Sequence, residues 1–476
     1  MPEPLFYNSL TKHVEPFKPL EPGKVSMYHC GPTVYKRQHL GNLRRFLFAD
    51  VVRRTLEFLG YEVREITNIT DVGHLTQDEI DAGADKLEVA AKAAKVTPQM
   101  IADEQTKLFM EDLASLNIQP SHKYPRATKH IKEMQQLITT LIEKGHAYAT
   151  PTGVYFDVAS YPAYGELSGN TVAAIAAGKR VAVRDEKKQP VDFALWIIDN
   201  QSLQKWDSPW GTGYPGWHIE CSAMSMEYLG TTLDIHTGGE DNRFPHHENE
   251  RAQSEAATGK PFVRMWLHNR HLQLDGKKLA KREGEQITLD TVRDKGVHPL
   301  AFRLFVFSAH YRTYLDFTWE NLKAFSDHLV SFRSLLRRLH EQQVTSTGTP
   351  DQAVLETFGN ALADDVNTPT AWAIVLQYVK TVNTALEQGS FTAKDAATAL
   401  ATLLALDKVV GVFEPLLNEL AAESIPAEIQ DLAQQREAAR ANRQFEEADR
   451  LRVLLEEKGF VIEDTPRGPR VVPKGP

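Results

Sequence analysis

The sequence predicts an α/β protein in which a sheet-based first part is followed by a largely helical second part. Three patterns support this prediction. A strand pattern, a helix pattern and a second strand pattern follow one another between residues 24 and 69. Residues 231–241 form a further strand pattern that ends in glycines. From Pro299 to about Lys458, apolar residues recur almost throughout at helical spacing.

The composition is that of a globular protein, with 42% hydrophobic and 25% charged residues. The 476 residues are too many for one core and suggest roughly three domains of ~150 residues each. No apolar run approaches the ~20 residues that span a bilayer, and the N-terminus lacks the apolar core of a secretory signal. We therefore expect a cytoplasmic protein. The net charge of −9 does not indicate a nucleic-acid partner, but local basic patches keep one possible.

The first part of the chain has the pattern of a βαβ unit. Residues 24–35 begin with strand alternation, which Gly31 and Pro32 end. Residues 39–60 carry apolar side chains at helical spacing and end in a glycine, and residues 61–70 return to alternation. Such a unit predicts two parallel strands joined by a right-handed crossover.

The next segments predict helices and a hairpin before the pattern weakens. Helices are expected over residues 78–95, 97–117 and 127–145, and a hairpin over residues 146–158. From about residue 161 to 216 the chain is rich in glycine, proline and aspartate, and no element is predicted there.

The stretch FPHHENERAQ, from Phe244 to Gln253, suggests a metal site. Pro245 suits the first turn of a helix, where its missing N–H costs nothing. On such a helix Glu250 shares a face with His246, four residues before it, and with His247, three before it. An imidazole and a carboxylate can supply two zinc ligands. On this stretch alone, glutamates that favour a helix N-terminus are the commoner explanation.

Zinc requires at least three protein ligands and usually four, so further ligands must come from elsewhere. The chain has only two cysteines, Cys30 and Cys221, which excludes a disulfide framework. They are the obvious candidates for the missing ligands. Spacing alone equally allows two buried thiols that act as small apolar side chains.

Two further stretches could bind phosphate. HLGN, from His39 to Asn42, lies where the first strand turns into the first helix, so backbone N–H groups and the helix dipole favour an anion there. A plain helix cap by Asn42 is the alternative. DGKKLAKREG, from Asp275 to Gly284, could clamp a polyphosphate through its lysines, although most such runs are solvated loops.

Together these stretches resemble the class I cysteinyl-tRNA synthetases over essentially the whole chain. PGWHIECSAMS together with FPHHENE is the most specific part. The matching motifs, in the order of the family, are YHCGPTVY with HLGN, NITDV, WDSPWGTGYPGWHIECSAMS, DIHTGGEDNRFPHHENERAQS, DGKKLAKREG, ADDVNTPTAW and RQFEEADRLRVLLEEKGFVIEDTPRG.

The resemblance implies a site residue by residue. The zinc ligands fall on Cys30, Cys221, His246 and Glu250, which selects His246 over His247. The implied catalytic residues of the HIGH and KMSKS motifs are His39, Asn42, Lys278 and Lys281. The implied substrate-binding residues are Gly31, Thr70, Trp217, His236 and Asp241. The implied anticodon contacts are Arg440, Asp449 and Asp464.

This sequence departs from the family pattern at some of these positions. The KMSKS loop reads Lys278-Leu279-Ala280-Lys281-Arg282, so both serines are absent while the second lysine remains. Asn42 replaces the last histidine of the HIGH motif, a variant that the family tolerates. We expect altered loop dynamics and retained activity.

The resemblance also implies six parts, with a Rossmann-like catalytic domain and a C-terminal α+β anticodon-binding region. They are 1–125, the first half of the catalytic domain; 126–216, an insertion; 217–272, the second half; 273–318, the KMSKS-like loop and stem-contact region; 319–420, a helical bundle; and 421–476, the anticodon-binding region.

The expected function is ATP-dependent ligation of L-cysteine to cysteine tRNA through a cysteinyl-adenylate. One Zn²⁺ per chain is expected to select the substrate thiol, and ATP is expected to act with Mg²⁺. We expect a monomer that has no membrane partner. Two alternatives are weighed against this expectation. A mycothiol-type cysteine:amino-sugar ligase lacks most of the anticodon region, which this chain carries. A zinc-containing RNA-binding paralogue with weakened catalysis is disfavoured because His39, Lys281 and the four zinc positions are present.

Overall fold

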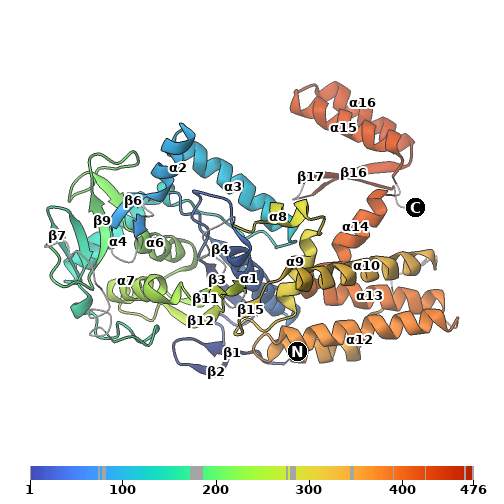
Figure 1. The fold of residues 1–476 in the computed structure, drawn as a ribbon, viewed down its shortest axis with the longest axis horizontal. Coiled ribbons are helices and arrows are strands. Elements are labelled where there is room, and N and C mark those ends of the chain that lie inside the picture. The colour runs from blue at the N-terminus through green and yellow to red at the C-terminus, as the bar shows by residue number, and fades with distance from the viewer. Residues whose placement is uncertain are drawn as a thin grey trace. The chain divides into compact units, whose positions relative to one another are not determined.

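The computed structural model describes most of the chain and divides into two compact units (Figure 1). The described residues are 2–72, 75–77, 82–171, 186–274, 277–278, 286–342, 348–389, 391–423, 425–465 and 468–473. The first unit comprises residues 1–325 and 356–374, and the second comprises residues 326–355 and 375–476. The six-part division expected from the sequence is finer than this and stays a prediction.

A four-stranded parallel sheet is the centre of the first unit. Its strands are β3 (Lys24–His29), β4 (Glu62–Thr67), β11 (Leu233–Gly239) and β12 (Val263–Asn269), in the order β12-β11-β3-β4. The predicted α/β class with a parallel sheet is therefore confirmed. Because all four strands run the same way, their carboxyl ends meet at one edge, where ligands bind in such folds.

The helix α1 (Leu40–Phe58) connects β3 to β4, as predicted. A buried ion-pair cluster fixes its middle. The Asp50 carboxylate lies 2.8 Å from Arg54 Nε and 2.7 Å from Arg303 Nη2 of α9 (Pro299–Phe307), and accepts a hydrogen bond from the backbone N–H of Gln119. This cluster joins α1 to α9 and to the segment after α3 (Pro98–Ser115).

The helix predicted over residues 78–95 is wrong in its first part. Residues 82–85 form a strand, β6 (Ala82–Asp85), which pairs with β5 (Leu75–Gln77), and α2 (Lys86–Ala94) begins only after them. The Asp85 side chain accepts a hydrogen bond from the Glu88 backbone and so caps α2. An aspartate caps a helix start better than it fills a helix interior, which explains the shift. The third predicted helix is confirmed as α4 (Ile131–Glu143).

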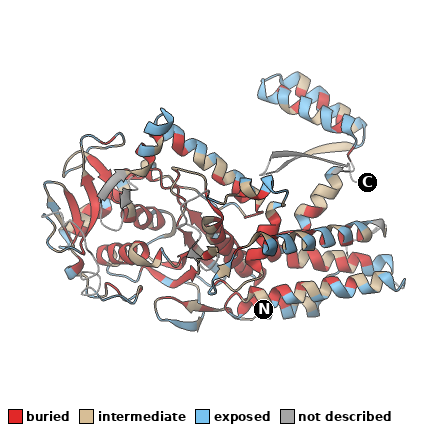
Figure 2. Cartoon of the chain, in the orientation of Figure 1, coloured by how far each residue is buried: buried red, intermediate tan, exposed pale blue. Residues whose placement is uncertain are grey.

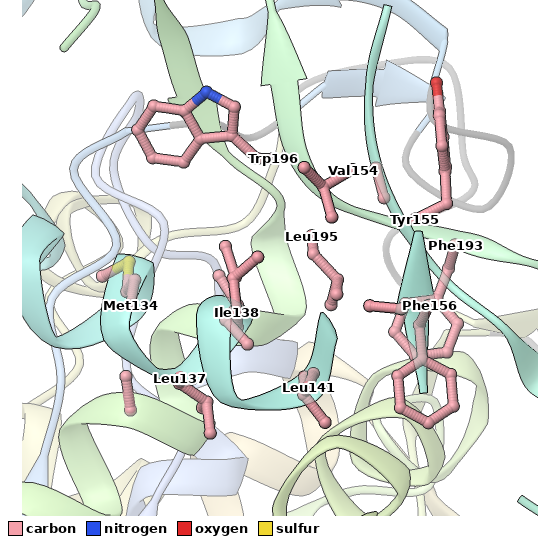
Figure 3. Close-up of a cluster of buried hydrophobic side chains, with 14 of the residues drawn as sticks. Met134, Leu137, Ile138, Leu141, Val154, Tyr155, Phe156, Phe193, Leu195 and Trp196 are labelled. Carbon is pink, nitrogen blue, oxygen red and sulfur yellow. The ribbon is translucent and has the colours of Figure 1, made fainter. Parts of the chain in front are cut away.

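The chain from residue 126 to 216 contains more regular structure than its sequence pattern indicates. An antiparallel sheet forms in the order β10-β9-β8-β7, with strands β7 (Ala147–Thr150), β8 (Gly153–Phe156), β9 (Phe193–Ile198) and β10 (Gly213–Pro215). Figure 3 shows Met134, Leu137, Ile138 and Leu141 of α4 beside the side chains of β8 and β9 in one buried cluster.

The helix of the FPHHENERAQ stretch starts later than predicted. An irregular helical turn, Arg243–His247, comes first, and within it Phe244 is extended with φ −141° and ψ 133°. The regular helix α7 (Glu248–Thr258) starts with His247 as its N-cap. Pro245 thus lies before the helix and not in its first turn. His246 and Glu250 still face each other, with Nε2 and Oε1 3.0 Å apart.

Short elements complete the first unit. They are β1 (Leu5–Asn8), β2 (His13–Pro16), α6 (Trp217–Leu229), β13 (Leu272–Leu274), β14 (Lys277–Lys278), α8 (Leu289–Asp294), β15 (Leu315–Asp316) and α11 (Gln352–Ala363), which straddles the division between the units. The helices α10 (Trp319–Glu341) and α12 (Thr368–Glu387) also belong partly to each unit.

The second unit is largely helical, as predicted, and ends in a strand pair. Its remaining elements are α13 (Ala393–Val410), α14 (Phe413–Glu423), α15 (Ala427–Ala441), α16 (Phe445–Glu457), β16 (Phe460–Thr465) and β17 (Gly468–Pro473). Figure 2 shows that much of the α15–α16 hairpin is exposed. Among the described helices none is by itself long and apolar enough to cross a membrane, although α13 and α14 together, bent by 116°, meet that length and composition.

Candidate functional site

Four side chains from three distant stretches of the sequence meet at the carboxyl edge of the parallel sheet. Cys30 follows β3 directly, Cys221 lies in α6, His246 lies in the turn before α7, and Glu250 lies in α7. Their ligand atoms all lie within 4.8 Å of one another, and all four residues are buried. The structure therefore brings together the four residues to which the family resemblance assigns the zinc.

The distances within this cluster suit a small cation. Cys30 Sγ lies 3.8 Å from Cys221 Sγ and 3.4 Å from Glu250 Oε1. Glu250 Oε1 lies 3.0 Å from His246 Nε2. Two thiols, an imidazole and a carboxylate form a donor set typical of zinc.

The structure also gathers a second possible ligand set, which sequence reasoning missed. Cys30, His236, His247 and Glu250 meet the same 4.8 Å limit. His247 Nε2 lies 3.3 Å from Cys30 Sγ, and His236 Nε2 lies 3.0 Å from Glu250 Oε2. Both sets share Cys30 and Glu250, so geometry alone leaves two choices, one with two cysteines and one with two histidines. Helical spacing had flagged His247 beside His246, but nothing in the sequence places His236 of β11 against Glu250.

Neighbouring rings hold these histidines in place. The Trp217 ring stacks on His246 with 4.2 Å between ring centroids, and His246 Nδ1 lies 2.8 Å from His218 Nδ1. On the other side, His247 Nδ1 lies 2.9 Å from His268 Nε2. Contacts to the second ring nitrogen fix the orientation of a ligating imidazole. Trp217 thus shapes the site through His246.

Burial sets the protonation of the donors. It raises the pKa of the Cys30 thiol well above its ordinary value and that of the Cys221 thiol to about 11. It lowers the pKa of His247 well below its ordinary value, so this imidazole is neutral. Without a cation the thiols stay protonated, and binding of a metal must release their protons.

The start of α1, where the sequence predicts anion binding, lies next in the chain after β3. His39 is its N-cap, and His39 Nδ1 accepts a hydrogen bond of 3.3 Å from the Asn42 backbone N–H. Asn42 is therefore not the cap residue, and its side chain donates to Gln38 instead. The backbone N–H of Leu40 donates to the Ile287 carbonyl at 2.9 Å. This contact ties the helix start to the segment after the predicted phosphate loop.

Gly31 and Thr70 line the edge of the sheet next to Cys30. A Cβ atom at Gly31 would lie 1.5 Å from the Asn68 carbonyl oxygen, so only glycine fits there. The Asn68 side chain accepts a hydrogen bond from the Gly31 N–H at 2.8 Å and donates one to Thr70 Oγ1 at 3.1 Å. These contacts fix the backbone directly beside the buried thiols.

Asp241 and the lysines of the predicted phosphate loop are the remaining residues predicted for this part of the site. Asp241 follows the glycines of β11, and its side chain is 53% exposed, with its carboxylate 3.9 Å from His271 Nδ1. Lys278 lies in β14, whose backbone pairs with Gln273 of β13. The Lys278 side chain and all of Lys281 lie outside the described residues.

The residues predicted to contact the anticodon belong to the second unit. Arg440 lies in α15 and Asp449 in α16, and both are exposed. Asp464 lies in β16, where its side chain is outside the described part of the chain.

Comparison with protein families agrees with this geometry. The model for the tRNA synthetases class I (C) catalytic domain matches residues 16–327, which is more than half of the chain. The chain belongs to the cysteinyl-tRNA synthetase family. A DALR domain model matches residues 357–414, and the model for the cysteinyl-tRNA ligase anticodon binding domain matches residues 422–470. The activity of the family is the ligation of cysteine to tRNA, so this chain is an enzyme.

Similar proteins cover nearly the whole chain. A cysteine–tRNA ligase of Chlorobaculum tepidum is 43% identical over 477 residues, which cover 97% of each chain. Cysteine–tRNA ligases of Deinococcus radiodurans and Thermus thermophilus are 40% and 39% identical, and each covers 98% of this chain. The matches cover 96% of the Deinococcus radiodurans protein and 98% of the Thermus thermophilus protein.

Solved structures of other class I synthetases share the fold. A Mycobacterium tuberculosis methionyl-tRNA synthetase in complex with methionyl-adenylate has a TM-score of 0.56 at 14% identity, and the match covers 83% of this chain and 91% of that one. An Agrobacterium radiobacter LeuRS-tRNA-LeuAMS ternary complex has a TM-score of 0.59 at 11% identity, and covers 86% of each chain. At these identities the likeness concerns the fold alone.

Proposed function

We propose that this enzyme activates cysteine as cysteinyl-adenylate and that zinc held by Cys30, Cys221, His246 and Glu250 selects the substrate thiol. We also propose that the C-terminal α15–α16 hairpin reads the anticodon. The observation that carries the proposal is the meeting of two buried thiols, an imidazole and a carboxylate within 4.8 Å, at the sheet edge where α1 begins. Charging of tRNA with cysteine follows from the family. The intermediate, the metal and the residues are the proposal.

The donor chemistry favours the set with two cysteines over the set with two histidines. Zinc is borderline-soft, so a second thiolate strengthens its binding more than a second imidazole. The Trp217 ring also stacks on His246, the histidine of the two-cysteine set. When bound, the metal would supply a Lewis acid to which a thiolate binds much better than a hydroxyl.

This arrangement of residues then explains how the enzyme distinguishes cysteine from serine without an editing site. Cys30, Cys221 and Glu250 are all buried, and the elements packed around them fix their orientation. A site that forms one specific bond to its substrate can reject an analogue that lacks the bonding group by roughly 10⁴-fold, which a hydrophobic pocket cannot do. Discrimination by sulfur therefore needs no second, hydrolytic site.

Activation itself requires positioning and charge stabilisation, without a protein nucleophile. The start of α1 presents the positive end of the helix dipole, with His39 at its N-cap, to the phosphates of ATP. Asp241 presents an exposed carboxylate to the ribose side. The cysteine carboxylate attacks the α-phosphate of ATP, pyrophosphate leaves, and Lys278, Lys281 and Mg²⁺ are proposed to stabilise the transferred charge.

The second unit offers a surface for the anticodon. Arg440 and Asp449 are exposed on adjoining helices, and Phe445, at the start of α16, is 63% exposed. Unstacked bases are read in this way, by hydrogen bonds to their edges and by stacking on aromatic rings. The match to the anticodon binding domain over residues 422–470 weighs against the cysteine:amino-sugar ligase. The cytoplasmic location and the monomeric state stay predictions.

The direct test is cysteine-dependent ATP–pyrophosphate exchange, measured with cysteine and with serine, before and after chelation. We expect exchange with cysteine, a cysteine preference of roughly 10⁴ over serine, and loss of that preference after chelation and its recovery with Zn²⁺. Exchange without charging of cysteine tRNA would instead favour the amino-sugar ligase. Absence of any cysteine-dependent exchange would favour the RNA-binding paralogue.

A further inference from the structure

Arg45 of α1 points into the same sheet edge as the proposed metal centre. Its Nη1 donates a hydrogen bond to Asn242 Oδ1 at 3.1 Å, and its Nη2 donates one to the Gly31 carbonyl at 3.3 Å. Gly31 follows Cys30, and Asn242 follows Asp241. The guanidinium therefore joins the ends of β3 and β11, between the proposed thiol and nucleotide sides of the site.

Arg45 differs from Arg53 and Arg54 of the same helix in the partners it has. Arg53 pairs with Glu57 and Glu65, and Arg54 pairs with Asp50. Among the described residues no carboxylate pairs with Arg45, and its buried Nε has no hydrogen-bond partner.

The guanidinium of Arg45 lies over the Phe46 ring, 4.9 Å from the ring centroid, but its polar contacts are few for a partly buried cation. Arg45 has two hydrogen bonds, both to neutral oxygens, and neither satisfies its Nε. A partly enclosed cation is costly unless an anion and further acceptors complete its surroundings. Arg44, its neighbour, also donates only to neutral oxygens, the carbonyls of His271 and Thr313, but it is 1% exposed whereas Arg45 is only partly buried.

We propose that Arg45 binds an anionic oxygen of the substrates, either the carboxylate of the amino acid or the α-phosphate of the nucleotide. This inference rests on the proposed adenylation site. Both groups must meet at the edge where β3 and β11 end for the carboxylate to attack the phosphate. Arg45 lies at that edge without an ion pair to any described carboxylate, although the Asp241 carboxylate attracts its charge. A bound anionic oxygen would supply a direct charged partner and a further acceptor.

The experiment compares cysteine with cysteamine, which keeps the thiol and amine but lacks the carboxylate. Wild type, Arg45→Met and Arg45→Lys are assayed for the KM of cysteine and of ATP in pyrophosphate exchange, for inhibition by cysteamine, and for zinc content. Lys18→Met, which removes an exposed lysine of the N-terminal segment, is the control for loss of a positive charge.

If Arg45 binds the carboxylate, Arg45→Met raises the KM of cysteine roughly 10- to 100-fold and leaves cysteamine inhibition and the KM of ATP unchanged. If it binds the α-phosphate, the KM of ATP rises by a similar factor and that of cysteine does not. Arg45→Lys restores part of the loss in either case. Should Arg45→Met fail to fold, the same comparison is made with Arg45→Lys, which is expected to show the same selective loss in weaker form.

Two results would overturn the inference while leaving the proposed function intact. In the first result, the binding of cysteine and of cysteamine weakens equally and the zinc content falls, which means that Arg45 only offsets the charge of the thiolates. In the other, no KM changes while wild type exchanges normally, which means that Arg45 only holds the Gly31 backbone. Failure of wild type itself to bind cysteine or cysteamine would contradict the proposed function instead.

Discussion

The charged groups of the first unit and those of the C-terminal hairpin are arranged in opposite ways. In the first unit, Asp50 is 2% exposed and lies between two arginines, and the candidate metal ligands are also buried. In the hairpin, Arg450 and Glu447 form an ion pair whose side chains are 67% and 45% exposed. The same residue types are therefore held in fixed positions in the buried cluster and lie open to solvent in the hairpin.

The energetic consequence is that effects of substitution should fall steeply from the first region to the second. Removing one partner of a buried pair leaves an uncompensated charge in a poor solvent. An exposed pair contributes little, because water and salt replace each partner. The predictions below follow this gradient.

The largest effect is expected at Asp50. Burial opposes ionisation of this carboxyl, but Arg54 and Arg303 more than offset it, so its pKa is lowered from the ordinary value. Asp50→Asn should destabilise the first unit by about 3–5 kcal/mol at neutral pH. Because a lowered pKa contributes stability above the unfolded-state pKa, the difference from wild type should shrink as pH falls below about 4. Urea unfolding across pH measures both; a loss independent of pH would contradict the ion-pair explanation.

The next effect distinguishes the two possible ligand sets. Cys221→Ser changes only the two-cysteine set, and His247→Gln changes only the two-histidine set. We expect Cys221→Ser to weaken zinc binding by more than roughly 100-fold, because loss of a direct ligand exceeds the 10- to 100-fold cost of losing a group that only hydrogen-bonds to a ligand. His247→Gln should cost less. Metal content after dialysis against a graded chelator gives the comparison, and the reverse order would assign the metal to the histidine set.

A smaller and more selective effect is expected at Arg440. Since its side chain is exposed, Arg440→Ala should leave folding and cysteine-dependent exchange unchanged. If Arg440 reads a base, loss of the contact costs about 1–3 kcal/mol, so the kcat/KM for tRNA falls at least tenfold. Arg452→Ala on the same hairpin is the matched control, because Arg452 pairs with Glu456 on the surface. Equal losses in both variants would point to general electrostatic attraction.

The smallest effect is expected at the exposed pair of α16. Arg450 Nη2 lies 2.7 Å from Glu447 Oε1, and both side chains are exposed to solvent. Arg450→Met should leave the unfolding midpoint of the second unit unchanged within error. Thermal unfolding with intrinsic fluorescence and circular dichroism is sufficient for this comparison. A clear drop in the midpoint would show that exposure is a poor guide to the energetics of this hairpin.

The sequence predicted elements whose pattern reflects a single buried face. β3, β4 and α4 show regular alternation or helical spacing, and each lies where it was expected. β9 was missed because Phe193–Ile198 is buried along almost its whole length, so its sequence shows no alternation. The helix expected from residue 78 failed because Asp85 acts as a cap rather than a helix-interior residue.

The candidate site was predictable as far as chemistry and family motifs reach. The four proposed ligands come from residue types that bind zinc, and the structure brings them together. The second set could not be foreseen, because the contact between His236 and Glu250 depends on how β11 packs against α7. Arg45 was missed for the same reason: its sequence position looks like that of any helix arginine, and only the fold directs it to Gly31.

The proposed zinc site is tested most directly by X-ray absorption at the zinc edge of the purified enzyme, with and without cysteine. The two-cysteine set predicts two sulfur neighbours at about 2.3 Å, and a third when cysteine is added. Serine should add none. A single sulfur neighbour of zinc in the free enzyme, or no new sulfur neighbour on addition of cysteine, would contradict the proposal that zinc binds the substrate through its thiol.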